Sequence, residues 1–183
     1  MTSPKSEKLK HYIRRIPEFK GVVFWDITTL LKDGDIFCSC VNEISKHFKP
    51  KDVDVIVSPE ARGFILGAAV AHDMKVGFVP IRKLGKLPSK TITSTYAKEY
   101  EKDSIEMHED AISKGDRVLF IDDLLATGGS ASASIKLIEA AGGKVVGLGF
   151  LIELEYLKGR LDGKLRKKHD VFSLVKYKSV SDT

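Results

Sequence analysis

Four runs of apolar residues, separated by segments with helical periodicity, constrain the fold of this chain more than any other feature. The runs are VDVIV (53–57), VGFVPI (76–81), RVLFI (117–121) and KVVGLGFLIEL (144–154). They are almost continuously apolar instead of alternating between apolar and polar residues, as in strands that are buried on both faces. Their alternation with helices predicts an α/β fold, in which helices flank a central, mostly parallel β-sheet.

The helices are predicted from apolar residues that recur on one face. They cover residues 9–16 (ended by Pro17), 37–48 (closed by Pro50), 63–72 and about 131–141 (ended by Gly142-Gly143). Residues 82–102 are polar and lack a helical period, so we expect a long mobile loop or a hairpin there. The length of 183 residues suits a single domain.

The composition argues against membrane insertion and secretion. No run reaches the roughly 20 apolar residues that cross a bilayer, and MTSPKSEKLK lacks the apolar centre of a secretory signal. The two cysteines, Cys38 and Cys40, are too close together for a structural disulfide, so we expect both to be buried or partly buried thiols in a cytoplasmic protein. The net charge of +5 suits an anionic ligand or a plain solvated surface, and KLRKKH (164–169) suits a solvated loop or a nucleic-acid patch.

Three unusual segments each follow a predicted strand: SPEARGF (58–64), RKLGKLP (82–88) and DDLLATGGS (122–130). Ligands of parallel sheets bind at the carboxyl ends of the strands, so these segments should converge on one edge of the sheet. ARGF opens a predicted helix, whose free N–H groups suit an anion, and Arg62 adds a planar cation that fits phosphate. Read alone, RKLGKLP is either a solvated basic loop or an anion site.

The segment that leads into the helix near residue 131 combines small and hydroxyl residues: Ala126, Thr127, Gly128, Gly129 and Ser130. A helix start presents unpaired N–H groups, and glycine lets a ligand approach the backbone closely, so the segment predicts a phosphate-binding loop. Simple capping of the helix by a hydroxyl side chain is the alternative.

Asp122 and Asp123 directly precede this loop, but they cannot bind phosphate because like charges repel. They must face hydrogen-bond donors or a cation, such as a ribose diol or Mg²⁺ bound to phosphates. The loop and the acidic pair together predict a site for a phosphorylated ribose. An acidic pair that merely ends a strand at the surface is the alternative.

The stretch VLFIDDLLATGGS (118–130) resembles the signature of the type I phosphoribosyltransferases, which bind 5-phosphoribosyl 1-diphosphate. With GVVFWDITTLL, EARGFILGAAVA, IRKLGKLP and YAKEY, the resemblance covers most of the chain and narrows to the adenine-specific members of that family. It implies transfer of 5-phosphoribose to N9 of adenine in purine salvage, giving AMP and diphosphate. It also implies that Mg²⁺ is held mainly by substrate oxygens and water, with no direct protein ligand.

The resemblance further implies the architecture of that family, with a mobile catalytic loop over residues 82–102 and a small base-binding hood within residues 1–35. A cytoplasmic homodimer without nucleic-acid or membrane partners is implied as well. Asp122 and Asp123 would hold the ribose hydroxyls, and residues 126–130 the 5-phosphate. The diphosphate would be bound by Glu60, Ala61, Arg62, Arg82, Lys83 and Lys86.

Three further assignments rest on the same resemblance. A cis peptide is implied between Glu60 and Ala61, and the Arg82 side chain is implied to reach the site of a neighbouring subunit. Adenine would be bound by Val23, Phe24 and Trp25, with Phe24 stacking on the base. Glu99 would be the catalytic proton-transfer group near the imidazole edge of adenine, with Tyr100 as its loop partner.

The chain departs from the family at Trp25, where arginine is common, and in the short stretch PEFKG (17–21). Because the family reads the base mainly through backbone atoms, we expect Trp25 to tolerate substitution. Two other functions stay open on sequence grounds. One is transfer to hypoxanthine, guanine or xanthine, and the other is a nucleic-acid-binding regulator that senses 5-phosphoribosyl 1-diphosphate on the same fold.

Overall fold

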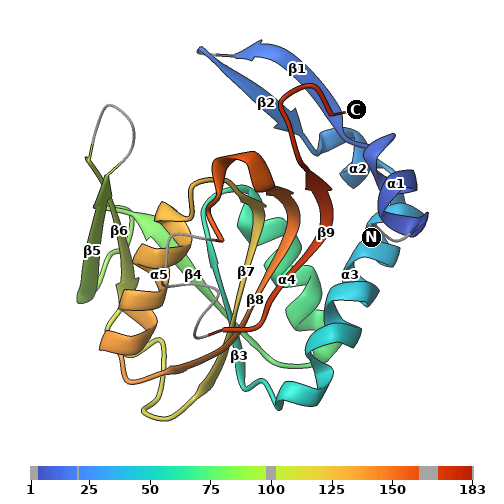
Figure 1. Ribbon diagram of the computed structural model, residues 1–183. Helices are drawn as coiled ribbons and strands as arrows, with labels where there is room; N and C mark the ends of the chain where they lie inside the picture. The colour runs from blue at the N-terminus through green and yellow to red at the C-terminus, as the bar shows by residue number, and fades with distance from the viewer. Residues whose placement is uncertain (1–3, 20, 98–101, 161–168, 183) are drawn as a thin grey trace.

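The computed structural model describes residues 4–19, 21–97, 102–160 and 169–182. Its main feature is a seven-stranded sheet with the strand order β5-β6-β4-β3-β7-β8-β9 (Figure 1). The four predicted apolar runs are confirmed as β3 (Val55–Pro59), β4 (Gly77–Lys83), β7 (Arg117–Leu125) and β8 (Lys144–Leu154). Together with β9 (Val171–Tyr177) they form the parallel part of the sheet.

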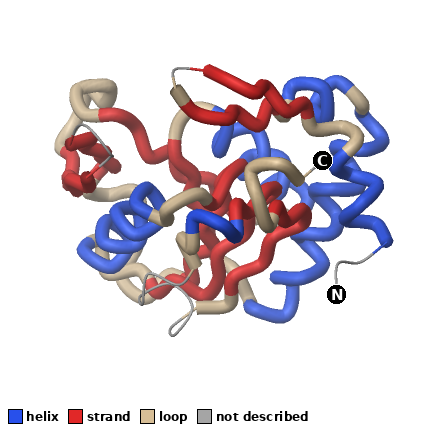
Figure 2. Tube along the Cα trace, turned by 45° about the horizontal axis from the view of Figure 1, so that its top comes forward, coloured by secondary structure: helices blue, strands red, loops and turns tan. Residues whose placement is uncertain are grey.

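Helices cover both faces of the sheet, as predicted for a parallel α/β fold (Figure 2). On one face, α3 (Gly34–Phe48) and α4 (Arg62–Met74) pack over one buried apolar cluster. On the other face, α5 (Gly129–Ala140) packs over a second cluster. Successive residues of β7, Leu119 and Phe120, belong to different clusters, which explains why this strand is apolar throughout.

Within residues 82–102, the end of β4 and a turn lead into the first strand of a hairpin at the edge of the sheet. β5 (Thr91–Ala97) pairs antiparallel with β6 (Lys102–His108), and β6 pairs antiparallel with the end of β4. Of the two forms expected for this segment, the structure therefore confirms the hairpin on either side of residues 98–101. The antiparallel edge brings a further wall of side chains beside the carboxyl ends of the parallel strands.

The first predicted helix, residues 9–16, is wrong except at residues 9 and 10. α1 (Pro4–Lys10) ends before Ile16, and the chain instead forms a separate hairpin of β1 (Arg14–Phe19) and β2 (Val22–Asp26) (Figure 1). Ile16 pairs with Phe24 across this hairpin, and the register shifts before Phe19. Pairing with β2 therefore overrides the local helical period, and the irregular register accommodates Pro17, which has no N–H to donate.

The remaining elements are one short helix and two 3-10 turns. α2 (Thr28–Lys32) follows β2, and two 3-10 turns, η1 (Lys49–Lys51) and η2 (Glu155–Leu157), follow α3 and β8. The indole of Trp25 stacks on the ring of Tyr177 in β9, with 3.7 Å between ring centroids, so the hairpin is anchored to the edge strand of the sheet. None of the described helices is long and apolar enough to span a membrane.

Candidate active site

The strand-following segments meet at one pocket of about 320 Å³, as predicted for the carboxyl ends of parallel strands. The predicted site residues that line it are Glu60, Ala61, Arg62, Lys83, Asp122, Asp123 and Ser130. β3 and β4 pair with Pro59 opposite Ile81, and β3 also pairs with β7, so the three segments are brought together by the sheet itself. The expected convergence is confirmed.

The two carboxylates of the acidic pair are buried and have different partners. Asp122 and Asp123 are 8% and 6% exposed because β7 continues through both of them to Leu125. Asp122 accepts hydrogen bonds from the backbone N–H of Asp123 at 2.8 Å and from the Ser130 hydroxyl at 3.4 Å. Burial, followed by the adjacent charge of Asp123, raises the pKa of Asp122 well above its ordinary value. Asp123 instead forms an ion pair with the Arg62 guanidinium.

The start of α4 approaches the acidic pair so closely that it requires glycine. A Cβ atom on Gly63 would lie 2.8 Å from Oδ1 of Asp122 and 2.9 Å from Cδ of Pro59. The peptide between Glu60 and Ala61 is cis, as the resemblance implied. Sequence reasoning gave Gly63 no role, because its neighbour Asp122 lies far away in the sequence and only the fold brings the two together.

The predicted phosphate loop leads into α5 without a side-chain cap. Gly128 is the N-cap residue, its φ of 83° lies in the left-handed region, and no side chain hydrogen-bonds the first turn from that position. The alternative of a hydroxyl side chain that caps the helix is therefore wrong for the N-cap position, which is a glycine. The Ser130 hydroxyl points instead to Asp122. Thr127 is exposed, and the free N–H groups of the first turn can receive an anion.

The four predicted cations are placed differently. Arg62 and Lys83 line the pocket. Arg82 lies beside it and donates from Nε to Glu60 at 2.5 Å, within the same chain. Lys86 does not line the pocket, and its backbone N–H donates to Glu106 at 2.8 Å.

The fold places the predicted adenine-binding residues in different surroundings. Phe24 is half-buried, and the guanidinium carbon of Arg62 lies 4.8 Å from the centroid of its ring, so Phe24 adjoins the pocket. Val23 is also half-buried, whereas Trp25 is only 3% exposed and packs on Tyr177. The expectation that Trp25 tolerates substitution is wrong on physical grounds, because its side chain is part of the core.

The β5–β6 hairpin adds three lining residues that sequence reasoning missed, Tyr96, Asp103 and Ile105. Pro59 of β3 and Ile81 of β4 complete the wall. The Tyr96 hydroxyl donates to Asp103 at 3.2 Å. Burial raises the pKa of Tyr96 to about 12, with Asp103 adding to the shift, so this phenol stays protonated at neutral pH. Glu99 and Tyr100, two of the predicted site residues, lie outside the described residues.

A buried glutamate organises the basic turn after β4. Glu106 is 3% exposed and accepts from the backbone N–H groups of Lys86 at 2.8 Å and Leu87 at 2.9 Å. The Thr91 hydroxyl donates to the same carboxylate at 3.3 Å. Burial favours the neutral form of Glu106, but the backbone donors outweigh it and lower the pKa.

Comparison with known proteins agrees with this geometry. A family model described as the phosphoribosyl transferase domain matches residues 38–182. The adenine phosphoribosyltransferase of Desulfitobacterium hafniense (strain Y51) is 52% identical over 168 residues, which cover 91% of this chain and 95% of that protein.

Two solved structures are similar over nearly their whole length. The crystal structure of adenine phosphoribosyltransferase from Thermoanaerobacter pseudethanolicus has a TM-score of 0.87 and 47% identity, covering 93% of this chain and 99% of that chain. The enzyme from Saccharomyces cerevisiae, complexed with an imino-altritol bisphosphate and adenine, has a TM-score of 0.86 and 35% identity, covering 93% and 98%. This chain belongs to the phosphoribosyl transferase domain family and, within it, to the adenine phosphoribosyltransferases.

Proposed function

We propose that the chain transfers 5-phosphoribose from 5-phosphoribosyl 1-diphosphate to N9 of adenine, giving AMP and diphosphate. The observation that carries this proposal is the buried pair Asp122–Asp123, which lies in one pocket between Arg62 and the start of α5. The 52% identity to an adenine phosphoribosyltransferase supports the same activity. The reaction returns a free purine base to the nucleotide pool.

Different parts of the site suit different parts of the substrate. The start of α5, with the hydroxyls of Thr127 and Ser130, suits the 5-phosphate because free N–H groups there favour an anion. Asp122 and Asp123 suit the ribose hydroxyls, which can donate to carboxylates. The diphosphate group is assigned to the opposite wall, which holds Glu60, Ala61, Arg62 and Lys83, with Arg82 and Lys86 nearby.

Adenine is assigned to the hood segment within residues 1–35. The half-buried ring of Phe24 offers a flat surface for a purine, and the backbone of Val23 and Trp25 offers donors and acceptors for the base edge. The Arg62 guanidinium lies over the Phe24 ring, so a base that stacks on the same face displaces it.

The proposed chemistry is a substitution at ribose C1. The bond from C1 to the diphosphate oxygen breaks, the bond from C1 to adenine N9 forms, and N9 loses its proton. Glu99, with Tyr100 beside it, is the proposed proton-transfer group at the imidazole edge, within the loop of residues 82–102. Cations that hold the departing diphosphate lower the barrier because negative charge develops there.

We propose that Mg²⁺ arrives with the substrate. Within the described ranges, no cluster of three or more His, Cys, Asp and Glu side chains is arranged to hold a metal. The carboxylates of Asp122 and Asp123 fit contacts with its bound water, while the substrate's own oxygens supply the direct ligands. When bound, the ion neutralises charge on the diphosphate.

Location and assembly are further proposals. Neither cysteine forms a disulfide, which fits a reducing compartment such as the cytoplasm. Cys40 is buried as expected, whereas the expectation for Cys38 is wrong, because its position on α3 is exposed. A homodimer is proposed from the expected role of Arg82 in a neighbouring site. The alternative of a nucleic-acid-binding regulator would use the basic stretch 164–169, of which His169 alone falls within the described part of the chain.

Product formation from labelled adenine, 5-phosphoribosyl 1-diphosphate and Mg²⁺ tests the proposal directly. We expect labelled AMP, and a much lower turnover with hypoxanthine, guanine or xanthine. Faster reaction with a 6-oxo purine would identify that base, and not adenine, as the substrate. Absence of any nucleotide product, together with a salt-sensitive gel shift of RNA or DNA, would favour the regulator.

A further inference from the structure

Gly159 packs directly against the backbone of the loop that precedes α5. A Cβ atom on Gly159 would lie 2.1 Å from the carbonyl oxygen of Ala126 and 2.9 Å from the backbone nitrogen of Gly128. Gly159 is buried, and its φ lies outside the left-handed region, so close packing and not backbone conformation requires glycine here. The shape of residues 126–128 is therefore coupled to the position of the segment after η2.

The next residue fixes that segment to the sheet. The Arg160 guanidinium donates from Nε to Oε1 of Glu153 at 2.6 Å and from a terminal nitrogen to Oε2 at 2.5 Å. It also donates to the carbonyl oxygen of Val171 at 2.9 Å and to the Ser173 hydroxyl at 3.2 Å. One side chain thus joins the segment after η2 to both β8 and β9.

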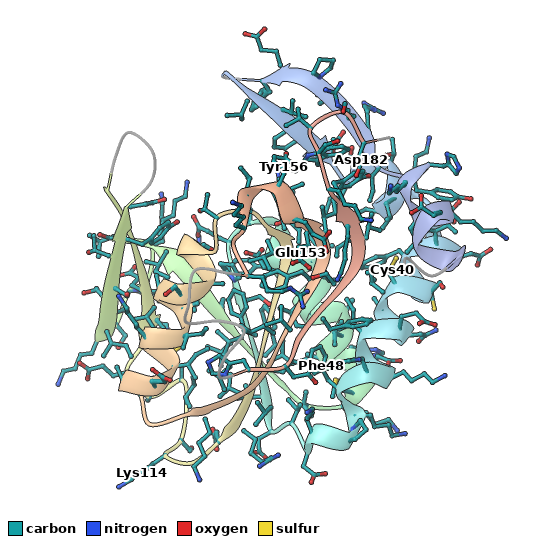
Figure 3. All side chains as sticks on the ribbon, in the orientation of Figure 1. Cys40, Phe48, Lys114, Glu153, Tyr156 and Asp182 are labelled. Atoms are coloured by element: carbon teal, nitrogen blue, oxygen red, sulfur yellow. The ribbon has the colours of Figure 1, made fainter. Side chains whose placement is uncertain are left out.

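Glu153 places this ion pair next to the phosphate loop. It is 3% exposed, lies near the end of β8 and pairs in the sheet with Leu125, the residue just before Ala126 (Figure 3). Lys176 of β9 approaches the same carboxylate, with Nζ 4.0 Å from Oε2. Because removing one partner leaves a buried charge uncompensated, this pair resists displacement of the segment.

We infer that Glu153, Gly159 and Arg160 form a buttress that positions the loop 126–128 to bind the 5-phosphate of the substrate. Arg160 is a positioning residue in this inference, because its guanidinium is already engaged by Glu153, Val171 and Ser173. The inference rests on the proposed function, which assigns the 5-phosphate to this loop. It extends that function to a segment in which sequence reasoning placed no site residue.

Gly159→Ala tests the buttress with the smallest steric change. We expect AMP, which carries the 5-phosphate, to bind about 10- to 100-fold more weakly, because losing one hydrogen bond to a charged phosphate has an effect of that order. Inorganic diphosphate, which does not use this loop, should bind as in the wild type. Gly34→Ala is the control, because no atom lies within 4 Å of a Cβ at that position. Calorimetric titrations with both ligands measure the difference.

Two variants of the ion pair separate positioning from direct phosphate binding by Arg160. If Arg160 bound phosphate itself, Glu153→Gln would leave that charge available and would preserve or strengthen AMP binding. The buttress predicts that Glu153→Gln and Arg160→Gln each weaken AMP binding and spare diphosphate binding. It also predicts that the double variant loses less than the two single losses combined, because each change breaks the same pair.

The outcomes distinguish the inference from the function on which it rests. Wild-type protein that binds neither 5-phosphoribosyl 1-diphosphate nor AMP contradicts the proposed function, and the inference with it. If the wild type binds these ligands, and folded Gly159→Ala and Arg160→Gln bind AMP as tightly as it does, the inference alone is overturned. Equal losses for AMP and diphosphate would also overturn it, because they would show a general structural defect. Thermal unfolding identifies any variant that fails to fold. The AMP and diphosphate affinities of the folded variants then test the inference.

Discussion

Asp122 and Asp123 are neighbours in the chain, but their carboxylates have different electrostatic surroundings. Asp123 is matched by the positive charge of Arg62. Asp122 is buried beside the charge of Asp123, and its raised pKa reflects both causes, with burial the larger. Its carboxylate still accepts hydrogen bonds from Ser130 and from the Asp123 backbone, which hold it in place. The pair therefore combines one compensated charge with one that is costly to bury.

Replacing Asp122 by asparagine should stabilise the fold and impair substrate binding. A pKa raised in the folded state favours folding below the ordinary value of 3.8 and loses that contribution as pH rises through the folded value. At neutral pH the carboxyl is ionised in the unfolded chain, so its raised pKa in the folded state opposes folding, and asparagine removes this cost. We expect a higher Tm for Asp122→Asn, with the gap to the wild type narrowing as pH falls toward 3.8. Unchanged affinity for 5-phosphoribosyl 1-diphosphate would contradict the ribose role.

Glu99 is the residue assigned to proton transfer, and its replacement should affect catalysis alone. Positioned acid–base groups contribute roughly 10² to 10⁴ in rate, so Glu99→Leu should lower kcat by about that factor. Glu99→Gln retains a hydrogen bond and should lose less. Single-turnover measurements report the chemical step, and calorimetry without adenine should show unchanged binding of 5-phosphoribosyl 1-diphosphate. Near-normal single-turnover rates for Glu99→Leu would end the catalytic assignment.

Trp25 should be sensitive to substitution through stability and not through base preference. Removing a buried large aromatic side chain costs roughly 3–5 kcal/mol, and Trp25→Arg would in addition bury a charge against Tyr177. Trp25→Phe should cost much less, because it keeps a ring on Tyr177 and removes an indole N–H that has no hydrogen-bond partner in the described structure. Chemical denaturation of the two variants measures this order. A changed ratio of adenine to hypoxanthine turnover in folded Trp25→Phe would show that the side chain shapes the base pocket.

At the scale of elements, the β5–β6 hairpin supplies one wall of the pocket and also supports the turn after β4, where Lys86 is proposed to bind the diphosphate. Tyr96, Asp103 and Ile105 face the pocket from the two strands of the hairpin. Glu106 of β6 binds the backbone of the turn after β4. The basic turn is therefore held by a carboxylate that takes no part in the proposed reaction.

Glu106→Gln should loosen this turn and weaken binding of the diphosphate group. The lowered pKa means that ionised Glu106 stabilises the fold above its ordinary value of 4.5, and that this contribution is lost as pH falls through the lower folded value. We expect lower stability than the wild type at neutral pH, a difference that shrinks in acid, and a raised KM for 5-phosphoribosyl 1-diphosphate. Glu109→Gln, which removes an exposed charge from the same region, is the control. Equal behaviour of the two variants would contradict the anchoring role.

At the scale of the whole molecule, the proposed homodimer would place the Arg82 side chain of one subunit in the active site of the other. Within one chain its Nε is bound to Glu60, which leaves its terminal nitrogens for other partners. If Arg82 serves the neighbouring site, mixing Arg82→Ala with Asp122→Asn subunits should restore activity that neither variant shows alone. One site of each mixed dimer then contains both intact residues. Absence of restored activity in mixed dimers, verified by their mass, would place Arg82 in its own subunit's site.

The sequence predicted the central elements because their signals are local. Continuous apolar runs identified β3, β4, β7 and β8, and the rule that ligands bind at strand carboxyl ends correctly placed Glu60, Lys83 and Asp122 at one site. The elements that were wrongly predicted or missed depend on contacts between segments that are distant in the sequence. Residues 9–16 have a helical period, and pairing with β2 makes their last part a strand instead. β9 was not predicted, although it anchors Trp25 through Tyr177.

The sequence by itself determined the fold class, the acidic pair, the small loop and the family to which the chain belongs. These properties reside in short segments whose chemistry is complete in residue types and spacing. Tertiary structure alone decided which carboxylate is paired with Arg62, why Gly63 and Gly159 must be glycine, and that Trp25 belongs to the core. Burial, pKa and close packing depend on atoms from segments far apart in the chain, and only the folded sheet brings those atoms together.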